Sequence, residues 1–466
     1  MVRYNINAKM FNRLCKFKIS SILIIFFIVL SSFTVSSVYI SVKENVTDEN
    51  YDLLIITPDK FANLLKILER HKEKHSIETE IHSLSSIYNG YELEGRDYQE
   101  KIKLFIKNEY DLHNITYVLL VGGYRLLPLR YVSNVDLDSA WPELEFISDL
   151  YYADLYDSNG NFSSWNSHEN GRFGEWSRDM ADDRDIDLKP DVYVGRLACS
   201  NIIELITVIQ KIIAYETKTN GSEWFKKMVG VGGDSYIEYE GNEGEINTQN
   251  AMNNMPNFEH VQLWVSNGNL IEPDDVINTI NQGCGFIYFD GHGTPMWWVT
   301  YPTNNNTEYI YGLSTVRMNL LKNRNKLPIC VVSSCHNVQI DVKPIKILYE
   351  PSFHSTWLLK SWAWKFVSKI GGGSIAVIGN TGFGLSRQDK ESLEGADSYL
   401  CPQFFWQIGM NNTEYLGEAW GKAINDYLEE FPIDWGTPHW SDSSKDAKTV
   451  QQWLLLGDPS LKIGGY

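Results

Sequence analysis

Short, continuous apolar runs recur along the chain, and stretches with helical periodicity separate most of them. The runs span residues 52–58, 77–82, 117–122, 191–197, 227–231, 260–265, 285–290, 329–333 and 373–378. Strands that are apolar on both faces are typical of parallel sheets covered by helices on each side. The pattern predicts an α/β fold with doubly wound, mostly parallel sheets and flanking helices.

The amphipathic segments between these runs predict the covering helices. The first follows Asp59, which we expect to act as its N-cap, and its apolar positions are Phe61, Leu64, Leu65 and Leu68. Other helices are expected at residues 98–110, 202–217, 274–282, 361–370 and 414–430. With 466 residues the chain is too long for one core, so we expect two side-by-side subdomains, an N-terminal one at 50–217 and a catalytic one at 218–466.

The N-terminal segment has the pattern of an export signal. Residues 1–18 carry five basic side chains and no acidic one, and a mostly apolar stretch follows at 19–42. We therefore interpret residues 1–45 as either a cleaved signal peptide or an uncleaved membrane anchor. The basic flank would stay inside and the body of the protein would lie outside. The protein is then secreted, or attached to the cell surface through this segment.

The charge and the cysteines exclude several classes of protein. The formal net charge is −18, which argues against nucleic acid as a partner. The six cysteines include no CxxC pair, so a zinc site is not indicated, and their spacing does not resemble a small disulfide framework. Most of these cysteines are expected to be buried, small apolar side chains.

Two apolar runs end in residues that can carry chemistry. The first reads FIYFDGHG and leads to His292, whose flanking glycines permit a tight or left-handed backbone and a close approach by substrate. The second reads ICVVSSC and leads to Cys335. A thiol beside an imidazole is readily deprotonated and can attack a carbonyl carbon. Neighbouring strands would bring the two side chains together, whereas we expect Cys330 in the core and His336 to project elsewhere.

At these residues the chain resembles the gingipain-type cysteine peptidases, which belong to a larger clan with caspases and legumains. The resemblance extends over DVYVGRLACSN at 191–201, GGGSIAVIGNTGFG at 371–384 and WLLLGDPSLKIGGY at 453–466. It implies a caspase-like fold and cleavage of peptide bonds through a thioester.

The resemblance also implies roles for individual residues. Cys335 would be the nucleophile and His292 the general acid and base. The backbone N–H groups of Gly293 and Cys335 would form the oxyanion hole. Some members place an acid near the imidazole, and the matching residue is Asp191, for which a purely structural role at the start of a strand is the alternative.

A polar loop after residue 153 is a candidate calcium site. Asp157, Asn159 and Asn161 have the 1, 3, 5 spacing of calcium loops, and Asp154 precedes them. The resemblance adds weight, because the family uses structural calcium. A plain turn rich in Asn and Gly is the alternative. No cofactor is expected for catalysis itself.

These features predict an exported cysteine endopeptidase that acts on protein or peptide substrates. A catalytically inactive surface binding or adhesion module and a transpeptidase of the same clan are the alternatives. Cleavage preference stays open. Trp297, Trp298, Asp341 and the turn at 380–384 lie near the predicted cleft, and an acidic pocket floor would favour Arg or Lys.

Overall fold

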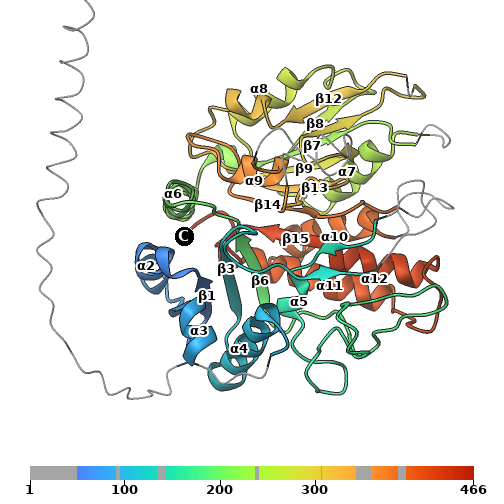
Figure 1. Ribbon diagram of the computed structural model, residues 1–466. Coiled ribbons are helices and arrows are strands. Elements are labelled where there is room, and N and C mark those ends of the chain that lie inside the picture. The colour runs from blue at the N-terminus through green and yellow to red at the C-terminus, as the bar shows by residue number, and fades with distance from the viewer. Residues whose placement is uncertain are drawn as a thin grey trace, which may run out of the picture. The chain divides into compact units, whose positions relative to one another are not determined.

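The computed structural model describes residues 50–90, 95–134, 143–236, 241–305, 307–342, 359–386 and 395–466. Within this part of the chain, ten strands form one central sheet (Figure 1). In spatial order they are β2 (Thr79–Ser83), β1 (Leu53–Thr57), β3 (Tyr117–Val121), β6 (Tyr193–Leu197), β15 (Trp453–Leu456), β14 (Ala376–Asn380), β13 (Ile329–Ser333), β9 (Phe286–Asp290), β7 (Lys227–Gly232) and β8 (Glu259–Trp264).

The sheet has two halves that run in opposite directions. Every neighbouring pair is parallel except β14 and β15, which are antiparallel. The strands from β2 to β15 therefore point one way, and those from β14 to β8 point the other way. The predicted α/β fold with a mostly parallel sheet is confirmed.

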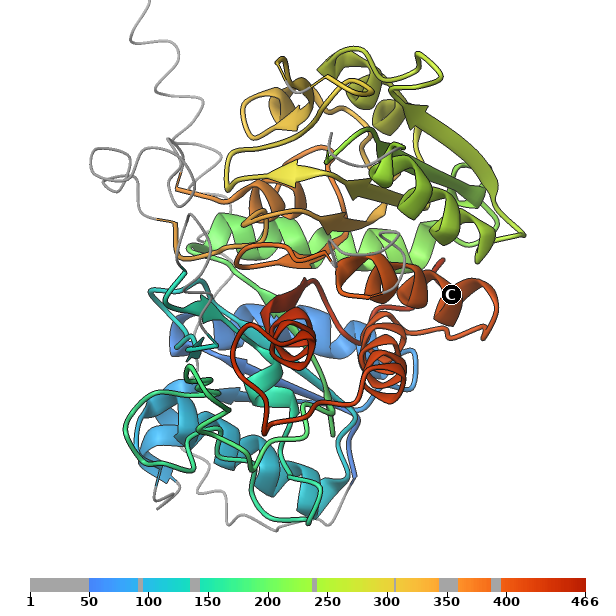
Figure 2. The same ribbon diagram turned by 90° about the vertical axis from the view of Figure 1, so that its right-hand side faces the viewer.

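Helices cover both faces of this sheet. Figures 1 and 2 show α2 (Asp59–Glu73), α6 (Ile202–Lys218) and α9 (Trp362–Val367) on one face, with α7 (Glu243–Asn253), α10 (Asp397–Gly409) and α11 (Leu416–Glu430) on the other. The remaining helices are α3 (Leu84–Gly90), α4 (Tyr98–His113), α5 (Leu150–Ala153), α8 (Pro273–Gln282) and α12 (Asp442–Gln452), with 3-10 turns at Glu223–Lys226 and Arg317–Leu320. The strand pair β4 (Tyr131–Val132) and β5 (Phe146–Ile147) lies outside the central sheet.

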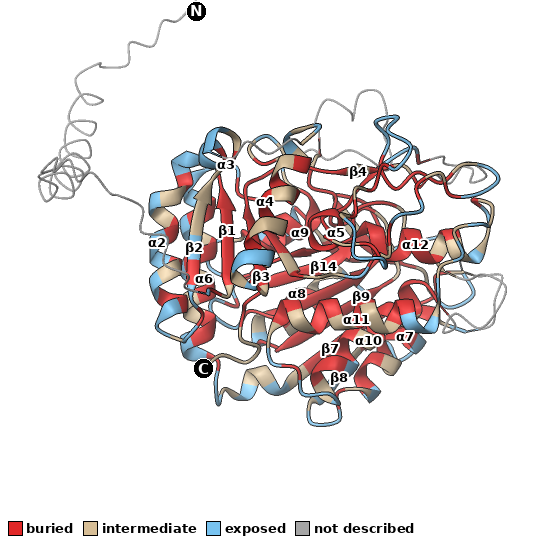
Figure 3. Ribbon diagram, turned by 90° about the horizontal axis from the view of Figure 1, so that it is seen from below, coloured by how far each residue is buried: buried red, intermediate tan, exposed pale blue. Residues whose placement is uncertain are grey.

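The core of the protein follows the apolar runs. Every residue of β1, β3, β9, β13 and β14 is buried (Figure 3). Helices pack on both faces of the sheet, so the side chains on both faces of each strand are buried away from water. This explains why these strands are apolar throughout and do not alternate between apolar and polar residues.

The predicted elements agree with the observed ones within a few residues, with three kinds of difference. β14 begins three residues later than the predicted run at 373–378. Pro58, not Asp59, occupies the N-cap of α2, and the Asp59 carboxylate instead accepts a hydrogen bond from Ser85. The helices α7, α10 and α12 and the strand β15 were not predicted individually. Helices α7 and α12 are too polar for a clear apolar stripe, and α10 contains Pro402.

The predicted leader at 1–45 lies outside the described residues. Within the described ranges no helix has the length and apolar character needed to cross a bilayer. The division into subdomains at 50–217 and 218–466 stays a prediction.

Candidate active site

The two reactive side chains follow neighbouring strands. β9 and β13 are parallel partners, and Asp290 is paired in register with Ser333. His292 and Cys335 each lie two residues beyond this pair, so both leave the same edge of the sheet. They line one pocket. Its other lining residues are Ser235, Tyr236, Glu243, Asn247, Asp290, Gly291, Ser333, Ser334, Gly384, Leu385, Ser386, Asp397 and Ser398.

The chain after β9 turns into a small antiparallel sheet that begins at the histidine. Its strands are β10 (His292–Gly293), β11 (Trp297–Thr300) and β12 (Ile310–Ser314), and His292 is paired with Val299. The imidazole Nε2 lies 2.9 Å from the carbonyl oxygen of Ser235. Because a carbonyl oxygen only accepts, Nε2 carries the proton of the neutral ring, and Nδ1 is left as a proton acceptor.

Burial sets the charge of both reactive groups. It lowers the pKa of His292, and the hydrogen bond to Ser235 and the charge of Asp234 oppose this effect. Burial raises the pKa of the Cys335 thiol to about 12, although a backbone hydrogen bond from Gly384 acts to lower this pKa. At neutral pH the free protein therefore holds a neutral thiol and a neutral imidazole, not a preformed ion pair.

Cys335 differs from the other described cysteines in its exposure. It is half-buried, whereas Cys199, Cys284, Cys330 and Cys401 are buried. The expectation that Cys330 belongs to the core is confirmed, with none of its surface exposed.

Gly293 lies directly against the turn that carries the thiol. A Cβ atom at this position would lie 2.5 Å from Asn337 Oδ1 and 2.8 Å from the carbonyl oxygen of Cys335. Neither Gly291 nor Gly293 has a positive φ. Close packing, not the left-handed backbone considered above, is thus the reason for the glycines. The two backbone segments expected to form the oxyanion hole are in contact.

The pocket is lined by acidic residues whose positions were not predicted from the sequence. Glu243, Asp290 and Asp397 line it, and none of the described lining residues is Lys or Arg. Burial raises the pKa of Glu243, that of Asp290 to about 6 and that of Asp397 to about 7. Among the described residues, Oε1 of Glu243 is buried without a hydrogen-bond partner. Asp290 already accepts hydrogen bonds from Tyr288 and Asn247, and Asp397 from Asn380 and Trp453. The Glu243 carboxylate is therefore the one best placed to bind a cation in the pocket.

Asp191 is not brought to this pocket. Its carboxylate accepts hydrogen bonds from the backbone N–H groups of Leu155 and Tyr156, at 2.6 and 3.0 Å. It precedes β6, and β15, β14 and β13 separate that strand from β9. Four strand spacings amount to about 19 Å. The acid whose charge acts on His292 is Asp234, at the end of β7, which the sequence reading missed.

His336 points away from the thiol, as expected. Its Nδ1 lies 3.2 Å from the carbonyl oxygen of Thr381, and its Nε2 lies 3.6 Å from Glu143. Glu143 also binds Lys448 Nζ at 2.9 Å and accepts a hydrogen bond from the backbone N–H of Phe383. This buried cluster connects the turn after Cys335 with the turn at 380–384.

The two candidate calcium ligands that carry carboxylates accept hydrogen bonds within the chain. Asp154 is buried, and its Oδ2 accepts a hydrogen bond from Trp165 Nε1. Asp157 accepts hydrogen bonds from the backbone N–H groups of Asn159 and Asn161, which closes the turn. The described residues contain no cluster of three or more His, Cys, Asp or Glu side chains suited to a metal ion. Calcium at this loop stays a prediction.

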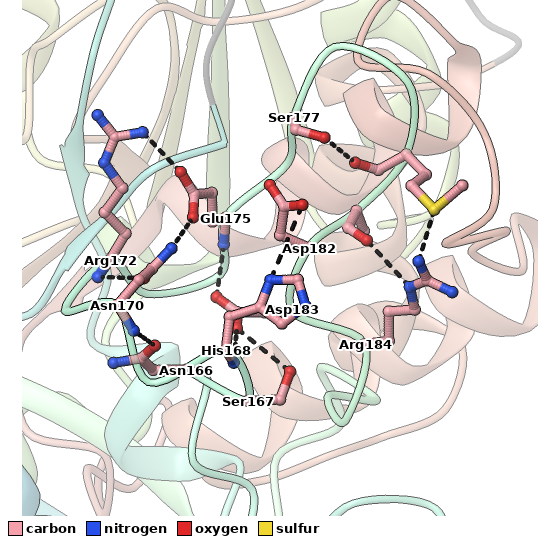
Figure 4. A network of polar contacts seen from close by, with 12 residues as sticks. Asn166, Ser167, His168, Asn170, Arg172, Glu175, Ser177, Asp182, Asp183 and Arg184 are labelled. Atoms are coloured by element: carbon pink, nitrogen blue, oxygen red, sulfur yellow. Dashed lines mark hydrogen bonds and ion pairs between the residues drawn. The ribbon is translucent and has the colours of Figure 1, made fainter.

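The loop that follows is held by its own hydrogen bonds (Figure 4). The Glu175 carboxylate accepts hydrogen bonds from Asn170 Nδ2 at 2.5 Å and from Arg172 Nη1 at 2.6 Å. Asp183 accepts hydrogen bonds from the backbone N–H groups of His168 and Glu175. The carboxylates of Glu175 and Asp183 therefore have partners within the chain.

The residues expected near the cleft divide into two groups. Gly384, from the turn at 380–384, lines the pocket. Trp298 is fully buried, and Asp341 is bound by Tyr131 and Gln339 away from the pocket lining. Trp297 lies on β11 and is half-buried.

Comparison with known proteins agrees with this geometry. The model of peptidase family C25 matches residues 46–464. Gingipain R2 of Porphyromonas gingivalis is 21% identical over 428 residues, which are 89% of this chain and 46% of that protein. Gingipain R1 is also 21% identical, over 89% of this chain and 34% of its own length. The chain thus spans less than half the length of these curated relatives.

Solved structures share the fold. The crystal structure of the Arg-specific cysteine proteinase gingipain R superposes with a TM-score of 0.58 at 16% identity, covering 90% of this chain and 79% of that one. A second solved structure of a protease superposes with a TM-score of 0.60 at 14% identity, and the match covers 89% of this chain and 78% of that one. The family match over nearly the whole chain identifies the protein: it belongs to peptidase family C25, a family of cysteine peptidases.

Proposed function

We propose that the protein is a cysteine endopeptidase that cleaves peptide bonds after basic residues. The observation that carries the proposal is the shared pocket, which contains a thiol, an imidazole and three carboxyl groups. Cys335 is the nucleophile and His292 the general acid and base. A peptide carbonyl between them can be attacked, and a basic side chain can enter the acidic part of the pocket.

The reaction starts from neutral partners. Nδ1 of His292 takes the proton of the Cys335 thiol as the sulfur attacks the carbonyl carbon, so the carbon–sulfur bond forms and the carbonyl oxygen becomes an oxyanion. The backbone N–H groups of Gly293 and Cys335 stabilise this oxyanion. The charge of Asp234 favours the imidazolium that forms at the same time.

The intermediate then collapses. The carbon–nitrogen bond breaks, and the imidazolium gives its proton to the leaving amine, which leaves a thioester on Cys335. Water attacks the thioester and gives a proton to His292. The carbon–sulfur bond breaks, and the sulfur recovers a proton from the imidazolium. With an amine in place of water, the same thioester would give a transpeptidase.

The pocket supports the preference for Arg or Lys. Oε1 of Glu243 has no described hydrogen-bond partner and is available to a guanidinium or ammonium group. An entering cation also favours the ionised forms of Asp290 and Asp397, whose raised pKa values leave them partly neutral in the free protein. The Arg specificity in the name of a solved relative agrees with this preference.

The proposed place of action is outside the cell. The basic flank and apolar stretch within residues 1–45 support export, either as a cleaved signal or as an anchor. Protein or peptide substrates are the partners, and nucleic acid is not.

A peptide-library cleavage profile tests this function. The full chain is compared with its Cys335→Ala and His292→Ala variants, and the products are sequenced by mass spectrometry. The proposal expects cuts after Arg or Lys that both variants lose. Equal cleavage by Cys335→Ala and the parent protein would refute the nucleophile, and cuts without preference for basic residues would refute the pocket assignment.

A further inference from the structure

A row of aromatic side chains crosses the small sheet that begins at His292. It consists of Tyr301, Tyr309, Tyr311 and Trp297, which we call the aromatic row. The rings of Tyr301 and Tyr309 are stacked, with centroids 4.7 Å apart and hydroxyl groups 3.0 Å apart. The ring centroid of Tyr311 lies 6.4 Å from that of Tyr309, and the ring centroid of Trp297 lies 6.5 Å from that of Tyr311.

Two members of the row are exposed and two are half-buried, whereas the opposite side of the same sheet is buried. Tyr309 is 50% exposed and Tyr311 is 46% exposed, whereas Trp298 and Leu313 are fully buried. The pairing of β11 with β12 shifts register between Trp298 and Val299, so that Leu313 lies opposite Trp298 and Tyr311 opposite Val299. The exposed Tyr311 and the buried Leu313 therefore lie on different faces of the sheet, although they are only two residues apart. Adjacent exposed rings of this kind are typical of binding surfaces.

The aromatic row is continuous with the reactive pocket. The ring centroid of Tyr301 lies 5.4 Å from that of His292. The imidazole delivers a proton to the leaving amine, so the part of the peptide that leaves must pass over it. The row extends from the imidazole and therefore lies on the leaving-group side of the scissile bond.

We propose that the aromatic row binds an aromatic side chain in the leaving-group part of an extended peptide substrate. This subsite rests on the proposed peptidase function and adds a second determinant of its substrate. The ring centroids are 5.4 Å apart between His292 and Tyr301 and 4.7 Å apart between Tyr301 and Tyr309. Tyr309 therefore lies at most about 10 Å from His292, a distance that an extended chain spans in about three residues. The preferred aromatic residue is then the second or third beyond the cleaved bond.

Paired peptides test the subsite. The pairs share one Arg before the cleaved bond and differ only in Phe or Ala at the second or third position after it. The full chain should cleave the better Phe peptide about three- to tenfold faster in kcat/KM than its Ala partner, the gain expected from one aromatic contact. Tyr309→Ala should bring this ratio close to one, and Tyr309→Phe, which keeps the ring, should preserve it.

A matched tyrosine elsewhere provides the control. Tyr98 is 60% exposed on α4, and Tyr98→Ala should retain the Phe preference. Equal rates for both members of every pair in the parent protein, or a ratio unchanged in Tyr309→Ala, would overturn the subsite while leaving the peptidase function intact. Failure to cleave any peptide would overturn both.

Discussion

Ser333 and Asp290 are register partners on the parallel strands β13 and β9, and each stands two residues before a reactive side chain. This pairing brings Cys335 and His292 to the same edge of the sheet and to the same pocket. Two segments more than forty residues apart are thereby brought to one site by the pairing of their strands. The sheet register is the structural basis of the proposed dyad.

The charge state of the thiol gives the first prediction. Because burial raises the Cys335 pKa to about 12, the thiolate is scarce at neutral pH in the free protein. Alkylation of Cys335 by iodoacetamide should keep rising from pH 6 to pH 10, as followed by peptide mass spectrometry. A plateau reached below pH 7 would show a preformed thiolate–imidazolium pair instead.

The acidic pocket gives the second prediction. Glu243→Gln removes a charge from a carboxylate that is only 6% exposed. For substrates with Arg before the cleaved bond, kcat/KM should fall by about ten- to a hundredfold, the loss expected for one charged hydrogen-bond partner. Glu223→Gln is the matched control, because its side chain is 85% exposed and lies outside the pocket lining. An unchanged rate in Glu243→Gln would exclude this carboxylate from substrate binding.

The contact between Gly293 and the nucleophile turn gives the third prediction. Gly293→Ala introduces a Cβ that must displace Asn337 or the Cys335 carbonyl. The proposed oxyanion donors then lose their alignment, and kcat should fall about a hundredfold or more. Gly90→Ala, where a Cβ would meet no neighbour within 4 Å, should retain activity. Parent-like kcat in Gly293→Ala would contradict the proposed oxyanion hole.

The buried Glu143 cluster gives the fourth prediction. Burial would raise the pKa of Glu143, but Lys448 and His336 outweigh it and the net pKa is lowered. Its ionised form therefore stabilises the fold above the ordinary glutamate range and loses this effect as the pH falls through its folded pKa. Glu143→Ala leaves Lys448 buried without this partner and should lower the free energy of unfolding by about 3–5 kcal/mol.

Urea denaturation measures this loss. The double variant Glu143→Leu with Lys448→Met removes both charges and should recover most of the stability. A loss below about 1 kcal/mol in Glu143→Ala would show that the cluster does not hold the two turns together.

The sequence predicted the parts of the fold whose signal is local. The runs that became β9 and β13 are apolar throughout and end in small residues, so the strands and the edge at which they deliver His292 and Cys335 could be anticipated. Helix α12 is too polar to give such a signal, and β15 is apolar but only four residues long. Their position depends on antiparallel pairing with β14, which only the folded chain determines.

The acidic groups of the site were harder to predict for a related reason. Asp397 is distant in sequence from both reactive residues and reaches their pocket only through tertiary packing. Glu143 likewise comes from a distant segment and lies beside His336, the residue after Cys335. The sequence motif indicated Asp191 as the acid near the imidazole. In the structure, Asp234 instead precedes Ser235, whose carbonyl group binds His292. Asp234 follows a pair of glycines after β7, and nothing in this local sequence indicated a role near His292.

Covalent labelling tests the central claim most directly. A peptide with a thiol-reactive acyloxymethyl ketone after Arg is incubated with the full chain at neutral pH, and the modified residue is identified by mass spectrometry. The account predicts a single adduct on Cys335 that forms slowly or not at all in His292→Ala and is absent in Cys335→Ala. An adduct on another residue, or labelling of Cys335 at an equal rate without His292, would contradict it.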